Sequence, residues 1–251
     1  MTEIYENEKI EDLQRGGLKL IAKKDAFCYG TDAVLLSGFA KVKKNWRIAD
    51  LGSGTGILVF LIGARNPGCV FDAVEIQDEF ADLLRRNVAL NGWQERVNVH
   101  NINLKDAPKV IGREKFDCVV CNPPYDKPTD ALITPNASAA ISRFEIECTL
   151  EDVFESAFAL LKNGGRMFMV HRATRISDIF SLAQEKRMAV KTVRMVYPKI
   201  TSEAKLMLIE CVKNASCQPR VLPALIINGD DGEYTDEVKE IYGIYSGKEN
   251  G

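Results

Sequence analysis

The chain has 251 residues, of which 46% are hydrophobic, and its formal net charge is −2. This length is sufficient for one large domain, or for one domain with a small annex. No apolar run approaches the roughly 20 residues that a membrane-spanning helix requires, and residues 1–6 lack the basic and apolar layout of a signal peptide. We therefore expect a cytoplasmic protein without a membrane partner.

Cysteine usage points to the same compartment. The seven cysteines are an odd number scattered along the chain, which argues against a disulfide framework and for a reducing environment. Cys118 and Cys121 form one C-x-x-C pair, but a zinc site normally needs a second pair or well-spaced histidines, and the chain has only His100 and His171. We expect no metal and interpret the pair as small core residues on a strand.

The N-terminal region predicts a β-hairpin and a short helix. Gly16 and Gly17 form a turn before a strand over 18–22. Thr31 is a plausible N-cap for an apolar helix that ends at Phe39. Strands and helices then alternate: strands are expected over 47–50, 70–75, 97–100, 116–121 and 166–170, and helices over 57–64, 78–91, 150–161 and 175–186.

The C-terminal part changes the pattern. Thr149 and Asp152 resemble a capping box for helix 150–161, and residues 163–165, Asn-Gly-Gly, are expected to end it. Two strands follow over 190–196 and 205–212 without a helix between them, so they should pair antiparallel at a sheet edge. The whole pattern predicts an α/β fold with a doubly wound, mostly parallel sheet.

We expect three parts in the chain. Residues 1–40 form an N-terminal annex packed on the main domain, residues 41–228 form that domain, and residues 229–251 form an acidic tail. The polar segment 126–146 is long for a loop, and loops of that length are usually functional. It is expected near the substrate.

A glycine-rich loop, Asp50-Leu51-Gly52-Ser53-Gly54-Thr55-Gly56, joins a predicted strand to a predicted helix. Glycines there permit a tight turn and a close approach of a ligand to the main chain, and the helix N-terminus favours an anionic group. The spacing is not the G-x-G-x-x-G of dinucleotide-binding proteins. Asp50 would attract an ammonium group, so the amine and carboxylate of S-adenosyl-L-methionine suit this loop.

Acidic and amide side chains follow the next two strands. Glu75 lies 19 residues after Gly56, at a strand end, where its two oxygens suit a ribose diol. Ile76 is placed to pack on an adenine ring. Asn103 is expected to accept a hydrogen bond from the adenine amino group, with Asn101 as the competing assignment.

The motif Asn122-Pro123-Pro124-Tyr125 follows the predicted strand 116–121, and so should lie beside the cofactor. An exocyclic amine or amide nitrogen is a poor nucleophile because its lone pair is delocalised. The side-chain oxygen of Asn122 and the backbone oxygen of Pro123 can accept the two amine hydrogens, which leaves the lone pair facing the methyl group. Pro123 and Pro124 restrict the backbone, and Tyr125 offers a face for stacking.

The charge is unevenly distributed. Residues 162–220 contain twelve basic and four acidic residues, whereas residues 228–251 contain seven acidic and two basic ones. A local basic excess suits a surface that faces nucleic acid, although solvated charges on ordinary strands and helices give the same count.

These motifs resemble the class I, Rossmann-like methyltransferases, and more closely the bacterial valine-tRNA adenine-37 N6-methyltransferase family. The resemblance also rests on residues 29–36, Tyr-Gly-Thr-Asp-Ala-Val-Leu-Leu. It implies a seven-stranded sheet with an antiparallel edge, and a cofactor pocket closed by Thr31 and Asp32. Asn103 stands where the family usually has Asp, and residues 143–145, Arg-Phe-Glu, replace its common Arg-His-Glu.

The resemblance implies N6-methylation of an adenine in tRNA, with the base flipped into a pocket formed by the Asn-Pro-Pro-Tyr motif. S-adenosyl-L-methionine is the implied cofactor and S-adenosyl-L-homocysteine the product, with residues 162–220 as the candidate tRNA contact surface. Two alternatives use the same type of motif: a protein glutamine N5-methyltransferase of the release-factor type, and a ribosomal RNA guanine-N2 methyltransferase. Nothing in the sequence indicates the oligomeric state.

Overall fold

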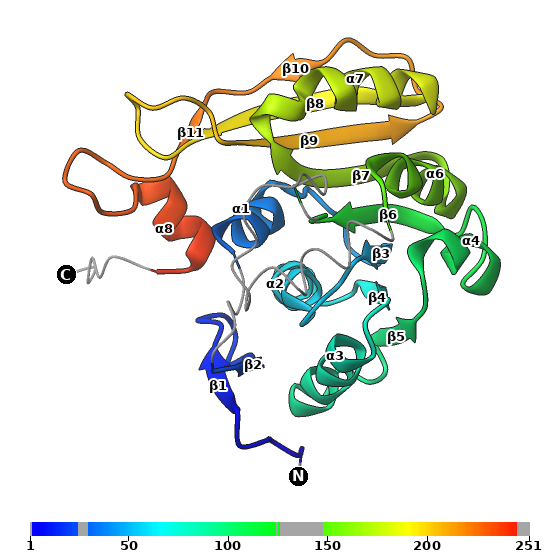
Figure 1. Cartoon of the computed structure of the whole chain (residues 1–251), viewed down its shortest axis with the longest axis vertical. Helices are drawn as coiled ribbons and strands as arrows, with labels where there is room; N and C mark the ends of the chain where they lie inside the picture. Colours follow the sequence, from blue (N-terminus) through cyan, green and yellow to red (C-terminus); the bar gives the residue numbers. More distant parts are fainter. Residues whose placement is uncertain (1, 25–29, 124, 126–147, 245–251) are drawn as a thin grey trace, which may run out of the picture.

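The computed structural model describes residues 2–24, 30–123, 125 and 148–244, and one large sheet forms the centre of the molecule (Figure 1). The strand order in this sheet is β10-β8-β9-β7-β6-β3-β4-β5, and β11 also pairs with β8. The strands are β3 (Arg47–Leu51), β4 (Val70–Glu75), β5 (Val97–Asn101), β6 (Phe116–Cys121), β7 (Leu161–Arg172), β8 (Met188–Tyr197), β9 (Leu206–Lys213), β10 (Arg220–Val221) and β11 (Leu225–Ile226).

The predicted mixed, mostly parallel sheet is confirmed. Strands β3, β4, β5, β6 and β7 run parallel to one another, and β9 pairs antiparallel with both β7 and β8. The expected count of seven strands was too low by two. The additional strands, β10 and β11, have two residues each and lie parallel to β8, so β8 is not the edge of the sheet. Two residues are too few to show a strand periodicity in sequence.

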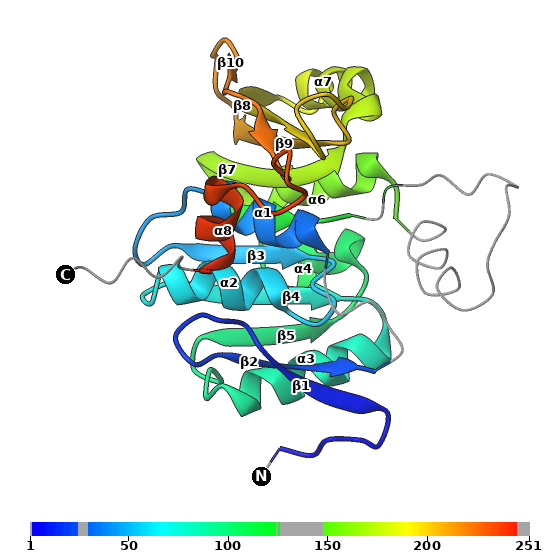
Figure 2. The same ribbon diagram turned by 90° about the vertical axis from the view of Figure 1, so that its left-hand side faces the viewer.

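Helices cover both faces of this sheet (Figures 1 and 2). They are α1 (Thr31–Phe39), α2 (Ile57–Arg65), α3 (Asp78–Leu90), α4 (Ala107–Val110), α6 (Leu150–Leu160), α7 (Ile176–Glu185) and α8 (Asp236–Tyr242), with 3-10 turns η1 (Leu104–Asp106) and η2 (Ala173–Arg175). One core cluster contains residues of α1, α2, α3 and α8, and a second contains residues of α4, α6 and α7. Within the described ranges, no helix is long and apolar enough to cross a membrane.

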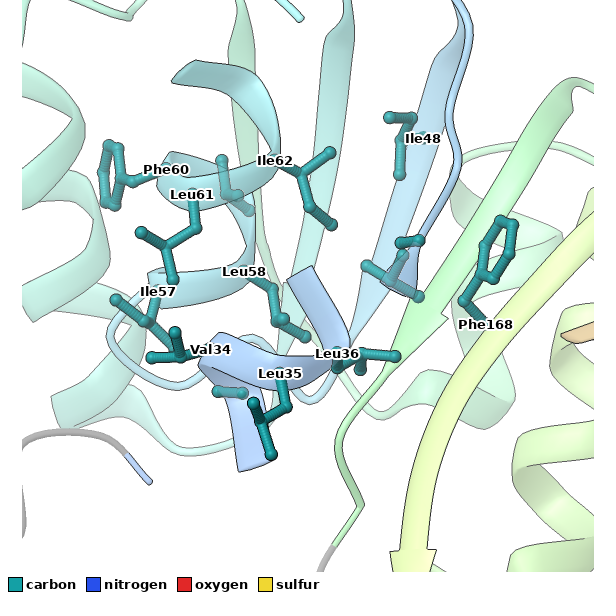
Figure 3. Close-up of a cluster of buried hydrophobic side chains, with 14 of the residues drawn as sticks. Val34, Leu35, Leu36, Ile48, Ile57, Leu58, Phe60, Leu61, Ile62 and Phe168 are labelled. Carbon is teal, nitrogen blue, oxygen red and sulfur yellow. The ribbon is translucent and has the colours of Figure 1, made fainter. Parts of the chain in front are cut away.

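The first core is built mainly by α1 and α2, whose apolar side chains meet β3 and β7 (Figure 3). Val34, Leu35 and Leu36 of α1 lie beside the apolar residues of α2 in this cluster, with Phe168 of β7 closing its far side. Val34, Leu35, Leu36 and Phe168 are at most 2% exposed. The helix pair therefore fixes the start of α1 against the sheet, close to the site described below.

The two cysteines of the C-x-x-C pair lie on opposite faces of the sheet. Side chains alternate along a strand, so Cys118 belongs to the first core cluster and Cys121 to the second. Both thiols are fully buried. Their interpretation as small core residues on a strand is confirmed, and this geometry prevents the pair from ligating one ion.

Two local predictions were wrong. Gly30, not Thr31, is the N-cap of α1, and Thr31 is its first helical residue. Gly164 and Gly165 do not end α6 but lie inside β7, because Leu161 already pairs with Phe116 and the register shifts between Phe116 and Cys118. The capping box is confirmed: the Asp152 carboxylate accepts from the Thr149 amide at 2.8 Å, and the Thr149 hydroxyl accepts from the Asp152 amide at 3.2 Å.

Both ends of the described chain pack on the main sheet assembly. The predicted hairpin is present as β1 (Glu8–Asp12) and β2 (Lys19–Lys23), beside α3. The Ile21 amide of β2 donates to Asn87 Oδ1 of α3 at 2.6 Å. At the other end α8 lies against α1, with Val238 fully buried.

Candidate active site

The carboxyl ends of β3, β4, β5 and β6 lie on one edge of the sheet because these strands are parallel and adjacent. The glycine loop follows β3, Glu75 ends β4, Asn103 follows β5, and Asn122 follows β6. Ligands in open α/β sheets bind outside such strand ends. The structure thus brings together the described residues that the sequence assigned to cofactor and chemistry.

The glycine loop adopts a backbone that other residues rarely adopt. Gly52, Gly54 and Gly56 have φ angles of +77°, +53° and +89°. A Cβ on Gly56 would lie 2.3 Å from Leu84 Cδ1 of α3. Ser53 is buried, and its hydroxyl donates to the Asp50 carbonyl at 2.9 Å, which holds the loop closed on itself.

Asp50 is fully buried, and neither of its carboxylate oxygens has a hydrogen-bond partner among the described residues. Burial, with a smaller effect of the nearby Glu75 carboxylate, raises the pKa of Asp50 to about 7. Buried polar groups are normally hydrogen-bonded, and a buried charge needs a partner. An unpartnered carboxylate beside a glycine loop is therefore suited to a ligand that carries a cation.

Glu75 is also buried but is firmly oriented. Its Oε2 accepts from the Gly54 amide and its Oε1 from the Gln77 amide, both at 2.9 Å. Burial raises the pKa of Glu75, and the backbone hydrogen bonds oppose that effect. Each oxygen keeps a free lone pair, which is the arrangement that a vicinal diol requires.

A small hollow with mostly apolar walls lies beside Glu75. Its lining residues come from the ends of β3, β4 and β5 and from the start of α6: Gly52, Val74, Ile76, Ile102, Asn103, Leu104 and Cys148. Ile76 and Asn103 are thus brought together, whereas Asn101 uses its Nδ2 to donate to the carbonyls of Glu75 and Ile76, both at 3.1 Å. The sequence did not single out Ile102 or Cys148.

The Asn-Pro-Pro-Tyr motif contacts the start of α1. The Tyr125 hydroxyl lies within hydrogen-bond distance of Asp32 Oδ2 and, at 2.9 Å, of Asn122 Oδ1. Burial and the Asp32 carboxylate raise the pKa of Tyr125, so its hydroxyl remains a neutral donor. Asp32 is therefore placed against the Asn-Pro-Pro-Tyr motif itself. Pro124 and residues 126–146 lie outside the described residues.

Thr31 is held from the other end of the chain. Its hydroxyl accepts from the Tyr242 hydroxyl of α8 at 3.1 Å. Tyr242 in turn stacks on Tyr234, with ring centroids 5.1 Å apart and an interplanar angle of 19°. The C-terminal segment, expected as an acidic tail, thus contains a helix that fixes the first turn of α1.

His171 is a residue of this site that sequence reasoning considered only as a metal ligand. It is buried near the end of β7, and its ring meets Tyr125 edge-on, with centroids 5.4 Å apart and an interplanar angle of 64°. Its Nδ1 accepts from the Arg172 amide. Burial, together with Arg175 and Arg172, lowers the pKa of His171 to about 4. The available signal was its position at the carboxyl end of an apolar strand.

This edge of the doubly wound sheet carries the unpartnered carboxylate of Asp50, the glycine loop, the oriented carboxylate of Glu75 and the amide oxygen of Asn122. Fold and site together define a Rossmann-like methyltransferase of class I. Residues 19–179, more than half of the chain, match the family model of the methyltransferase small domain. The chain belongs to this family, which confirms the predicted class of enzyme.

Similar proteins agree with this assignment. A relative from Bacteroides thetaiotaomicron, named tRNA1(Val) (adenine(37)-N6)-methyltransferase, is 29% identical over 220 residues, which are 87% of this chain and 90% of that protein. A relative of the same name from Aeromonas hydrophila is 26% identical and covers 82% of this chain and 85% of its own. The crystal structure of a predicted O-methyltransferase from Agrobacterium tumefaciens superposes with a TM-score of 0.68 at 21% identity, covering 85% and 96% of the two chains, which shows a shared fold.

Proposed function

We propose that this protein transfers a methyl group from S-adenosyl-L-methionine to the N6 amino group of an adenine in tRNA. The observation that carries the proposal is the position of Asn122 Oδ1, at the end of β6 and on the same sheet edge as the unpartnered Asp50 carboxylate. An acceptor for amine hydrogens next to a site for a cationic cofactor suits methylation of a planar nitrogen. The names of the two relatives support adenine in tRNA as the acceptor.

The cofactor fits the residues present. Asp50 would bind the ammonium group of the cofactor, and Glu75 would bind its ribose hydroxyls. The amino-acid part of the cofactor would pack against the glycine loop of Gly52, Ser53, Gly54 and Gly56. Ile76 and Asn103 line the apolar hollow beside Glu75, and they would contact the adenine ring there. Thr31 and Asp32 would close the pocket from α1. The bound cofactor would supply an electrophilic methyl group on a sulfonium.

The protein's own residues would orient the amine. Asn122 Oδ1 shares the single proton of the Tyr125 hydroxyl with Asp32 Oδ2, and it keeps a lone pair for an amine hydrogen. The Pro123 backbone carbonyl would accept the other hydrogen, with Pro124 restricting the backbone. Tyr125 would stack on the base, and its ring is supported from the side by His171. No strong base is required, because the nitrogen loses its proton readily once it carries the methyl group.

The acceptor is tested directly with labelled cofactor. The purified protein is offered unmodified total tRNA, ribosomal RNA and a release factor in separate reactions, and the RNA nucleosides are analysed by mass spectrometry. We expect N6-methyladenosine in tRNA alone. Label only in N2-methylguanosine of ribosomal RNA, or only in a protein glutamine, would replace this proposal by the corresponding alternative.

The role of Asn122 is tested by Asn122→Ala. Loss of a positioned polar group in a catalytic site typically lowers kcat by about 10²–10³, and we expect a loss of this order with unchanged cofactor binding. Asn98→Ala is the matched control, because Asn98 is exposed on the edge strand β5, which β3 and β4 separate from β6. Full activity of the Asn122 variant would contradict the mechanism.

A further inference from the structure

The edge of the sheet that carries the glycine loop and Asn122, the catalytic edge, has two halves that are set by the strand order. Strand β6, which carries the Asn-Pro-Pro-Tyr motif, has β3, β4 and β5 on one side and β7, β9 and β8 on the other. Apart from Thr31 and Asp32 of α1, the residues assigned to the cofactor lie at or just after the ends of β3, β4 and β5. A macromolecule that presents its base to Asn122 therefore has to lie over the half formed by β7, β9 and β8.

The turn between β8 and β9 lies on this second half. Strands β7 and β8 both pair antiparallel with β9, so they are parallel to each other and end at the same edge. The Ala173 amide, just after β7, donates to the Lys205 carbonyl at 3.0 Å. Residues 198–205 thus adjoin η2 and the end of the strand that carries His171.

The same topology splits the basic stretch 162–220 between two opposite edges. The start of β8 pairs with the end of β9 at the edge far from the site, as the pairing of Met188 with Lys213 shows. Three lysines near that far edge are neutralised: Lys162 by Asp117 at 2.6 Å, Lys186 by Glu151 at 2.6 Å, and Lys213 by Glu114 at 2.9 Å.

The lysines of the β8–β9 turn differ from those of the far edge. Lys199 and Lys205 are both exposed, and neither has an acidic partner within the part of the chain that the structure describes. Glu203 is the single acid between them. On the cofactor half, in contrast, Asp78 is exposed at the start of α3, and Glu79 beside it is paired with Lys23 of β2. The charges on the catalytic edge thus attract a polyanion to the β8–β9 turn and disfavour its binding at the end of β4.

We propose that Lys199 and Lys205 bind phosphates of the RNA strand that carries the target base. This inference rests on the proposed function, because it assigns the surface on which that RNA lies. It also narrows the contact surface from the whole stretch 162–220 to one turn on the catalytic edge. Phosphate neutralisation by lysines supplies salt-dependent affinity and fixes the register of the nucleic acid.

The test is the double variant K199Q/K205Q, assayed with a tRNA transcript. We expect the KM for tRNA to rise about ten-fold, whereas kcat at saturating tRNA and the Kd for the cofactor stay unchanged. The dependence of log Kd for tRNA on log salt concentration should become shallower by about 1.4, because each lost phosphate contact contributes about 0.7 on a single strand. K199E/K205E should raise the KM further.

The matched control is K41Q/K44Q, which removes the same charge from two exposed lysines at the start of β3, on the far edge. It should leave the KM and the salt dependence unchanged. If K199Q/K205Q and this control have equal KM and salt dependence, Lys199 and Lys205 do not bind the RNA, and the proposed function still stands. Absence of methyl transfer to RNA by the unsubstituted protein would overturn the proposed function itself. Equal thermal midpoints for all variants show that folding is not the cause.

Discussion

The pKa of the Asp50 carboxyl is set by its buried surroundings. This carboxyl is fully buried and unpartnered among the described residues, and its pKa is raised from 3.8 to about 7. A group whose pKa is raised in the folded state contributes stability below its unfolded pKa. That stability is lost as the pH rises through the folded value. The ligand-free fold should thus lose stability between about pH 4 and 7, where the Asp50 carboxyl is ionised in the unfolded chain but still largely protonated in the fold.

A bound ammonium group favours the charged carboxylate, and this predicts a pH-dependent affinity. The Kd for S-adenosyl-L-homocysteine, measured by calorimetry, should fall as the pH rises from about 5.5 to 7. Asp50→Asn should weaken binding at pH 7 and remove this dependence. The ligand-free Asp50→Asn protein should melt at a higher temperature than the unsubstituted protein at neutral pH, with a smaller gap at acidic pH. An unchanged pH profile in the variant would show that another group titrates.

At the scale of elements, the contact of α8 with α1 connects the C-terminal segment to the Asn-Pro-Pro-Tyr motif. Arg65 of α2 donates to Ser37 Oγ at 2.8 Å and to the Ile241 carbonyl at 2.7 Å, which ties both helices to α2. Gly38 permits the close approach, because a Cβ there would lie 2.9 Å from Ile241 Cγ2. The N-terminus of α1, with Asp32 at Tyr125, is positioned by this packing.

Because Gly38 and Ile241 are so close, the effect of Gly38→Ala on the free energy of unfolding should depend on the side chain at position 241. Gly38→Ala should destabilise the protein by about 1–3 kcal/mol, the usual cost of overpacking a core. In an Ile241→Ala background the clash is relieved, and Gly38→Ala should then stabilise the protein by about 0.5–1 kcal/mol through helix propensity. Urea denaturation of the four proteins measures both values. Destabilisation of equal size in both backgrounds would show that the two helices do not meet at this point.

Most elements were predictable because their patterns are local. Strands β4 and β6 have the predicted bounds, and the capping box starts α6 as expected. Helix α8 and strands β10 and β11 were missed. Short elements such as α8 gain their stability from tertiary packing rather than from propensity, so their sequence carries little signal. The glycine pair at Gly164 was misplaced because strand pairing at Leu161 overrides a local stop signal.

At the scale of the whole molecule, the division into residues 1–40, 41–228 and 229–251 remains our proposal. The packing indicates that these parts are not independent. Helix α1 shares a core cluster with α2, and Val238 of α8 belongs to the same cluster. The fragment 41–228 would expose apolar surface of α2 that α1 and α8 otherwise help to cover.

We therefore expect the full chain to unfold in one cooperative transition and the fragment 41–228 to lack one. Apolar surface left exposed removes the main favourable contribution to folding. Near-ultraviolet circular dichroism and thermal melting of both proteins, under the same conditions, check this expectation. A cooperative melt of the fragment with a native-like spectrum would show that the terminal parts are dispensable for folding.

The sequence by itself determined the alternation of strands and helices, the glycine loop and the Asn-Pro-Pro-Tyr motif. Each of these is encoded by neighbouring residues, through side-chain periodicity and backbone preference. Only the tertiary structure decided which residues meet. It left Asp50 without a partner, and it brought Tyr125 to Asp32, 93 residues away, and to His171. It also divided the basic stretch 162–220 between two edges, because the direction of a strand sets the edge at which its ends lie.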